Sequence, residues 1–265
     1  MSMSITKNVI KNTVKEVIRE LSAKRVFEYP DQVTPDQAEY KYVFAQDFER
    51  YWKLMQFLPE MGRKSEVLEV GTGIGYIAVL LRRLFDYNVT TIEHPSRDSL
   101  KNTSFIDGMK KENINVKSAD ILNKLEFPDG TFDMIIFSEV IEHLAPTPTI
   151  IRMVFNELSR ILRKNGNLVV TTPNVGTIES RIRGIRGISI QPFPLQNMSN
   201  DTYEHLRIYS VDEIKRIIEG CDCEVQKVGY SGYRKGKLSD IKRIVTESIY
   251  PAFGADMMVL GEKKK

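Results

Sequence analysis

The sequence predicts an α/β fold in which a seven-stranded, mostly parallel sheet carries helices on both faces. From residue 66 onward, short apolar segments alternate with helical patterns, which is the order that builds a parallel sheet covered on both sides. The first apolar segment, 66–70, runs directly into a turn containing Gly71, Gly73 and Gly75, and an apolar helical pattern follows. At 265 residues, the chain is long enough for one substantial core of this kind.

The individual elements follow from these patterns. Strands are predicted at 66–70, 89–93, 114–119, 132–138, 167–172, 223–230 and 256–261. Helices are predicted at 77–84, at 149–163 and, as an insertion between the last two strands, near 238–249. Thr147 followed by Pro148 is typical of a helix start. Ser210 and Glu213 have the spacing of a capping box, so another helix is expected to begin there.

Two further helices are expected before the first strand, where they could cover the ligand edge of the sheet. Residues 5–27 place apolar side chains on one face and cations every four residues on another: Lys7, Lys11, Lys15 and Arg19. These cations form either a surface for an acidic partner or a solvated face balanced by neighbouring glutamates. A second helix is expected over 39–57. The predicted division is an N-terminal helical cap, residues 1–60, and an α/β domain, residues 61–265, with an insertion at about 175–205.

Composition excludes several classes of protein. Hydrophobic residues make up 42% and charged residues 28%, as in ordinary globular domains. A net charge of +3 does not by itself indicate a nucleic-acid partner. No apolar run reaches the ~20 residues of a transmembrane helix, and lysines interrupt the N-terminus where a signal peptide would be apolar. Cys221 and Cys223 are read as reduced thiols, so a cytoplasmic location is expected; a C-x-C metal site would need a second cysteine pair.

The glycine turn is typical of a nucleotide-type ligand, because glycine lets the backbone bend sharply and approach the ligand. Dinucleotide sites carry G-x-G-x-x-G, whereas this turn is G-x-G-x-G with Tyr76 in place of the last glycine. Glu69 would repel a pyrophosphate but could hold the ammonium group of a bound amino acid. The turn resembles motif I of the class I S-adenosyl-L-methionine (SAM)-dependent methyltransferases, which have a Rossmann-like fold; the alternative is a tight structural turn.

In an open parallel sheet, ligands bind beyond the carboxyl ends of the strands. Glu93 ends the second strand, where its carboxylate could accept both hydroxyls of a ribose. Asp120 resembles the family's acidic residue at the adenine amino group, with the backbone of Ile121 also contacting the ring. The predicted SAM site comprises Glu69, Gly71, Thr72, Gly73, Gly75, Glu93, Asp120, Ile121 and Ser138.

Three longer segments narrow the resemblance. Residues 131–144 resemble motif IV of a methyltransferase subgroup that includes the ubiquinone-pathway O-methyltransferases, and the match continues in 162–174 and 203–214. Together the resemblance covers roughly residues 50–230. The layout of the loop at 175–203 resembles methyltransferases of glycan pathways. The resemblance therefore implies a small-molecule or glycan substrate that carries a hydroxyl.

The segment from Glu139 to His143 carries the candidate chemistry. If a helical turn begins after Ser138, then Glu139, Glu142 and His143 share one face, and His205 follows later in a polar segment. Two carboxylates and two imidazoles suit a divalent metal such as Mg²⁺, Mn²⁺ or Zn²⁺. Similar patterns occur in ubiquinone-pathway O-methyltransferases and small-RNA 2′-O-methyltransferases, which implies metal-assisted methylation of one of two adjacent hydroxyls.

Two other interpretations of this segment remain open. Without a metal, His143 or His205 would act as a general base oriented by a glutamate such as Glu142. In a purely structural interpretation, His143 caps the turn and Glu142 is solvated. The loop arginines, Arg181 to Arg186, either grip a phosphate or carboxylate of the substrate or form a solvated helix face.

Three rival functions are weighed against the predicted SAM-dependent O-methyltransferase. An NAD-dependent oxidoreductase would need the dinucleotide turn, which is absent from this sequence. An RNA methyltransferase would need a wider basic track than the sequence offers, so a nucleic-acid partner is disfavoured. A non-catalytic SAM-binding protein would tolerate loss of the cluster at Glu139–His143.

Overall fold

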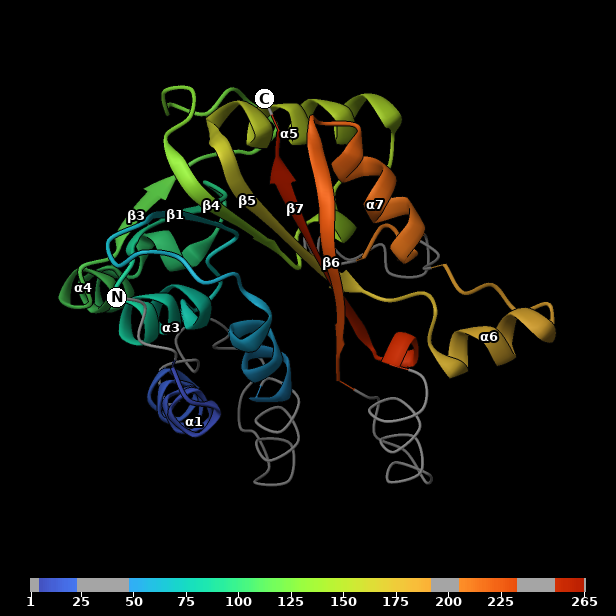
Figure 1. Ribbon diagram of the computed structural model, residues 1–265, viewed down its shortest axis with the longest axis horizontal. Helices are drawn as coiled ribbons and strands as arrows, with labels where there is room; N and C mark the ends of the chain where they lie inside the picture. Colours follow the sequence, from blue (N-terminus) through green and yellow to red (C-terminus); the bar gives the residue numbers. More distant parts are fainter. Residues whose placement is uncertain (1–4, 23–47, 192–204, 233–250, 265) are drawn as a thin grey trace.

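The computed structural model describes residues 5–22, 48–191, 205–232 and 251–264. Within these residues, seven strands form one sheet in the order β3-β2-β1-β4-β5-β7-β6 (Figure 1). The strands are β1 (Glu66–Val70), β2 (Asn88–Glu93), β3 (Asn115–Ser118), β4 (Phe132–Ser138), β5 (Leu162–Pro173), β6 (Cys223–Ser231) and β7 (Asp256–Lys263). All neighbours pair in parallel except β7, which is antiparallel to both β5 and β6. The prediction of a mostly parallel sheet is confirmed.

Helices in the described residues lie between the strands and before the first one. They are α1 (Lys7–Ser22), α3 (Tyr76–Phe85), α4 (Thr103–Lys111), α5 (Pro148–Ile161), α6 (Ile178–Ile185) and α7 (Val211–Glu219), together with a helical segment at 48–57. Both predicted helix starts are confirmed. The Thr147 hydroxyl accepts a hydrogen bond from the Ile150 amide, and both bonds of the Ser210–Glu213 capping box are present.

The boundary between α5 and β5 differs from the prediction. The predicted helix ended at 163 and the predicted strand began at 167, but α5 ends at Ile161 and β5 begins at Leu162. Leu162 already pairs with Phe132, and the register then shifts before Asn167. Asn165, at φ 60°, lies inside this irregular start. The start of β5 is therefore an irregular, polar stretch of strand, whereas the sequence pattern alone resembles a turn there.

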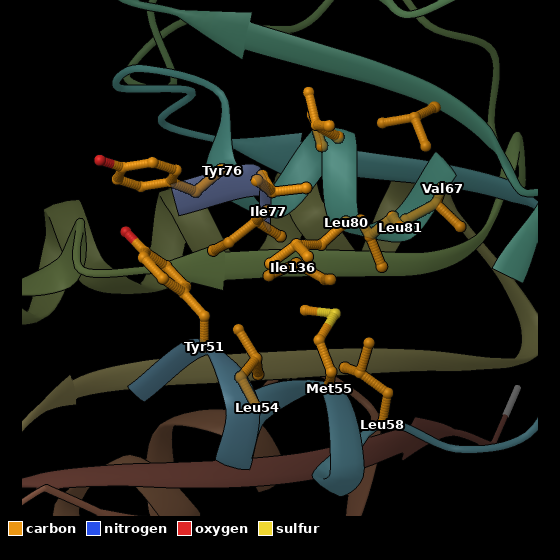
Figure 2. Packing of buried hydrophobic residues seen from close by; sticks show 14 of the residues in the cluster. Tyr51, Leu54, Met55, Leu58, Val67, Tyr76, Ile77, Leu80, Leu81 and Ile136 are labelled. Carbon is orange, nitrogen blue, oxygen red and sulfur yellow. The ribbon is translucent and has the colours of Figure 1, made fainter. Parts of the chain in front are cut away.

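The sheet divides the core into two layers, because successive side chains of a strand point to opposite faces. On one face, Val67 and Ile136 pack with α1, residues 48–57 and α3 (Figure 2). On the other face, Leu68 and Phe137 pack with α5 and α7. Figure 1 shows α5 and α7 together on one side of the sheet and α1 and α3 on the other.

Several predicted features extend outside the described residues. The predicted helix 5–27 is confirmed as α1 up to Ser22, and the predicted helix 39–57 is confirmed over 48–57. The helix near 238–249 and the end of the insertion at about 175–205 lie outside the described residues. The division into a cap and an α/β domain stays a prediction. None of the described helices is long and apolar enough to cross a membrane, and Cys221 and Cys223 are buried free thiols.

Candidate functional site

A cavity of about 840 Å³ opens at the carboxyl ends of β1, β2 and β4. Its wall contains the carboxylate and imidazole residues predicted from the sequence: Glu69, Glu93, Asp120, Glu139, Glu142, His143 and His205. It also contains Gly71, Thr72, Gly73, Ile121 and Ser138. The fold therefore brings residues that span more than half of the chain to one site. Gly75 is the exception among the predicted residues.

The glycine turn connects β1 to α3 and leaves space beside it. Gly71 has φ 82°, and a Cβ there would lie 2.7 Å from the Val140 Cγ2 atom. Its amide donates to the Ile92 carbonyl at 2.9 Å. Gly73 has φ 51° and nothing within 4 Å of a Cβ, so a ligand can approach the backbone there.

Gly75 and Thr72 serve the turn itself more than the cavity. Gly75 precedes α3 at φ 87°, and a Cβ there would meet the Met109 Sδ atom at 2.9 Å. Gly75 is thus closely packed behind the turn and does not line the cavity, and its predicted contact with the cofactor stays a prediction. The hydroxyl of Thr72 bonds to the Thr91 hydroxyl and to the Ile92 carbonyl, so the Thr72 side chain contacts β2.

Glu69 is an acid buried in the wall of the cavity. Its side chain lies on β1, the residue is 1% exposed, and its Oε2 atom has no hydrogen-bond partner among the described residues. Burial, reinforced by the nearby carboxylate of Glu93, raises the pKa of Glu69 well above its usual value, against a hydrogen bond from Thr91. A buried acceptor without a partner is costly, and a ligand ammonium would satisfy it. The amino-acid part of SAM fits this position.

Glu93 and Asp120 follow along the same edge. The Glu93 carboxylate accepts the Gly73 amide at 2.9 Å and the His94 amide at 2.8 Å. Asp120 accepts the Leu122 amide at 2.9 Å and the Asn123 side chain at 3.0 Å. Each carboxylate oxygen can accept two hydrogen bonds, so both acids retain acceptor capacity for ligand hydroxyl or amino groups.

The expectation that Glu139, Glu142 and His143 share a helical face is wrong. Glu139 has φ 54°, and the short 3₁₀ turn η3 begins only at Ile141 and ends at His143. The Glu139 carboxylate does not join the group of potential ligand atoms formed by Glu142, His143 and His205. It accepts the Thr171 hydroxyl at 2.8 Å and lies 3.6 Å from the Arg50 guanidinium. The same Thr171 hydroxyl bonds to the Ser138 hydroxyl at 2.7 Å.

Glu142, His143 and His205 nevertheless come together. One potential ligand atom from each lies within 4.8 Å of the others, and the two imidazole rings are 5.0 Å apart. Glu142 is fully buried, and its Oε2 atom accepts the Thr172 hydroxyl at 2.9 Å. Its Oε1 atom has no hydrogen-bond partner among the described residues and lies 4.0 Å from His205 Nε2.

Backbone contacts hold this cluster across a long separation in sequence. The Glu142 carbonyl accepts the Leu206 amide at 2.7 Å and the Arg207 amide at 3.3 Å. These bonds fix His205 next to the turn that carries Glu142 and His143. Burial, and then the nearby Glu139 carboxylate, raise the pKa of Glu142 well above its usual value. A buried acid aimed at two imidazoles fits a bound cation, which would compensate its negative charge.

Sequence reasoning missed the residues that helix 48–57 adds to the cavity. Arg50 and Tyr51 line it, and the Arg50 guanidinium donates to the Tyr51 hydroxyl at 2.8 Å. The Tyr51 ring lies 5.1 Å from that of Tyr76, at one end of the packed cluster in Figure 2. Tyr76 was noticed only as the residue in place of a glycine. The expectation that the N-terminal helices cover the ligand edge is supported for this segment, but no pattern marked its individual residues.

Known proteins with similar sequences carry the same kind of domain. Residues 43–228 match a family model described as a methyltransferase domain. A probable S-adenosylmethionine-dependent methyltransferase of Mycobacterium tuberculosis is 30% identical over 173 residues, covering 61% of this chain and 56% of the relative. A similarly described protein of Mycolicibacterium smegmatis is 26% identical over 202 residues, covering 74% of this chain and 65% of the relative. The chain thus spans little more than half the length of the first of these relatives.

Solved structures agree on the fold. A SAM-dependent methyltransferase of Thermotoga maritima, described as a possible histamine N-methyltransferase, superposes with a TM-score of 0.53 at 17% identity, covering 95% of this chain and 99% of that one. The pyocyanin biosynthetic protein PhzM superposes with a TM-score of 0.57 at 11% identity, covering 89% and 61%. Because the family model covers most of the chain, this chain belongs to the methyltransferase-domain family.

Proposed function

We propose that this protein transfers the methyl group of SAM to a hydroxyl oxygen of a small molecule or glycan, with a divalent cation held by Glu142, His143 and His205. The single observation that supports it most is Glu142. This carboxylate is fully buried, yet its Oε1 atom has no hydrogen-bond partner among the described residues and faces His205. A purely structural acid would have its bonds satisfied.

The cofactor end of the cavity is assigned in the same proposal. Glu69 binds the ammonium group of SAM, Gly71 and Gly73 let the backbone approach it, and Glu93 accepts the ribose hydroxyls. Asp120 and Ile121 border the adenine. These roles are supported by the Glu69 oxygen that has no hydrogen-bond partner among the described residues, the open space beside Gly73 and the position of all six residues in one wall.

Bound SAM supplies an electrophilic methyl group on a sulfonium, so the protein mainly has to align the acceptor oxygen and help remove its proton. The cluster of Glu142, His143 and His205 lies in the wall of the same cavity as the glycine turn and can hold the acceptor there. A cation bound to that cluster would lower the pKa of a coordinated hydroxyl, as metals do for bound water. One of two adjacent hydroxyls on the substrate is the acceptor we propose.

The donor set also bears on which metal is bound. With Glu139 directed to Thr171 and Arg50, the cluster offers one carboxylate and two imidazoles. Imidazole nitrogens suit Zn²⁺ better than Mg²⁺ or Mn²⁺, for which oxygen ligands are more suitable. We therefore place Zn²⁺ ahead of Mn²⁺ and Mg²⁺.

A metal-free mechanism has its own supporting observation. His205 Nε2 lies 4.0 Å from the Glu142 carboxylate, an arrangement in which the acid orients an imidazole that serves as general base. The two mechanisms make opposite predictions for chelation.

We also propose a cytoplasmic location, based on the two reduced thiols.

The experiment starts from purified protein, labelled SAM and fractionated cell extract, with mass analysis of the molecule that gains a methyl group. Transfer to a hydroxyl supports the proposal, and transfer to nitrogen or carbon would overturn the assignment of the acceptor atom. Transfer is then repeated after exhaustive chelation and after adding back Zn²⁺, Mn²⁺ or Mg²⁺. Full activity without metal would leave the general-base mechanism.

A matched control separates the cluster from histidines in general. The chain has three histidines, and His94 lines the cavity without belonging to the cluster. Metal content measured by emission spectroscopy should be lost in His143→Ala and His205→Ala and retained in His94→Ala. Equal metal content in all three variants would remove the cluster as the metal site.

A further inference from the structure

Helix α6 exposes apolar side chains that the described core does not use. None of its residues is buried. Six large hydrophobic side chains are exposed in the described residues, and three of them lie on α6 or just after its end: Ile182 at 46%, Ile185 at 88% and Ile188 at 47%. Exposed isoleucines gathered in one place are unusual on a soluble surface and mark an interaction site.

The stretch is amphipathic in a specific way. Ile178, Ile182 and Ile185 are spaced i, i+4 and i+7, so they form one stripe along the helix. Arg181 and Arg186 border the stripe on its two sides, as their spacing from Ile178 and Ile182 requires. This segment carries three arginines and one acid, Glu179, so its charge is positive.

The helix follows closely in the chain after a residue of the candidate site. It follows β5, whose last residue, Pro173, lines the cavity. Figure 1 shows α6 projecting from the sheet, away from α5 and α7. Arg181 ties its start to the fold, since it donates to the Gly176 carbonyl at 3.0 Å and lies over the Phe253 ring at 5.2 Å.

We propose that α6 is an interfacial helix that docks this protein on an anionic lipid surface. The isoleucine stripe enters the boundary between headgroups and acyl chains, and the flanking arginines bind the headgroup phosphates. Charge complementarity favours an anionic lipid surface, because arginines border both sides of the isoleucine stripe and an extended anionic plane can bind both of them at once. The proposal is independent of the methyl acceptor, and its test uses no catalytic measurement.

Vesicle flotation of the full chain tests the proposal. The protein floats with phosphatidylcholine vesicles that contain phosphatidylglycerol and does not float with phosphatidylcholine alone, and added salt weakens the binding. In the double variant Ile182→Ser/Ile185→Ser, partitioning falls at least about tenfold, because the apolar contact is lost. In Arg186→Glu it falls about fivefold or more, since each arginine near such a surface contributes about fivefold.

Matched controls change the same residue types elsewhere. Val9→Ser removes another exposed apolar side chain, on α1, and Arg152→Glu reverses an exposed charge on α5. Both should float like the wild type, and all variants should keep the melting temperature of the wild type. Equal flotation with neutral vesicles, no flotation at all, or wild-type flotation of the α6 variants would each overturn the proposal. So would a wild-type dimer in sedimentation that Ile182→Ser/Ile185→Ser converts to monomer, because a second copy would then cover the helix.

Discussion

Glu69 and Glu142 line the same cavity and have similar surroundings, but the fold positions them in different ways. Both are almost completely buried, each has one carboxylate oxygen without a hydrogen-bond partner among the described residues, and burial raises the pKa of both. Glu69 lies on a regular strand two residues before the glycine turn. Glu142 lies in a short 3₁₀ turn, and its backbone carbonyl accepts hydrogen bonds from the amides of Leu206 and Arg207.

The difference teaches how each end of the site is specified. At the proposed cofactor end, a strand, a turn and a helix in direct succession place Glu69 and the glycines locally. The acceptor end depends on contacts between segments far apart in the chain, which bring His205 to Glu142. Substitutions at the two ends should therefore separate cofactor binding from methyl transfer.

The largest effect is expected at the acceptor end. Glu142→Gln, His143→Ala and His205→Ala should each lower methyl transfer by about 10²–10⁴-fold, because proton removal from the acceptor loses its positioned groups. SAM affinity, measured by calorimetry, should stay close to the wild-type value. A parallel loss of SAM affinity in all three variants would show that the two ends are not separate.

A smaller effect is expected at the cofactor end. Glu69→Gln should weaken SAM binding by about 10- to 100-fold, because a charge-assisted hydrogen bond to the ammonium group is replaced by a neutral one. Calorimetric titration measures this affinity directly. Saturating SAM should restore most of the methyl transfer, whereas Glu142→Gln should not recover at any SAM concentration. Recovery of Glu142→Gln by SAM would contradict the assignment.

The same contrast explains what the sequence could predict. Glu69 and the glycine turn were found because a short apolar strand followed by glycines is a local pattern, and all seven strands follow similar signals. The separation of Glu139 from Glu142 was missed, because helical spacing assumes ordinary backbone and nothing local marks φ 54° at Glu139. Arg50 was missed because its position depends on packing of a helix that precedes the first strand.

Backbone geometry at the cofactor end provides the next prediction. Gly71→Ala should lower the free energy of unfolding by about 1–3 kcal/mol, since the left-handed backbone is strained for alanine and its Cβ would lie 2.7 Å from Val140. Gly108→Ala is the matched control, because it lies in α4 with nothing within 4 Å of a Cβ. Alanine there should stabilise the helix by about 0.5–1 kcal/mol. Denaturant unfolding measures both changes.

A second substitution sharpens this test. Val140→Ala in the Gly71→Ala background should relieve the contact with the Cβ but not the strain of φ 82°. Part of the lost stability should therefore return. Complete recovery would mean that the contact, and not the backbone, requires glycine at this position.

The smallest expected effect is a pH dependence of stability that both buried glutamates share. In the unfolded chain each acid releases its proton near its usual pKa of 4.5, whereas in the folded apoprotein the raised pKa keeps the proton bound to higher pH. The unfolded state then binds fewer protons, so the free energy of unfolding should fall as pH rises from about 5 to 8. Glu69→Gln and Glu142→Gln should each flatten this slope in chelated, SAM-free protein. Asp98→Asn is the control, because the Lys101 ammonium lowers the pKa of Asp98 and its titration lies below this range.

Metal addition should act on one of the two acids only. A cation binds the ionised carboxylate of Glu142, and its binding releases the proton from that group. Zn²⁺ or Mn²⁺ should therefore raise the melting temperature of the wild type more at pH 8 than at pH 6. The same increase should survive in Glu69→Gln and disappear in Glu142→Gln. Loss of the increase in Glu69→Gln instead would place the cation at the cofactor end and exchange the roles of the two glutamates.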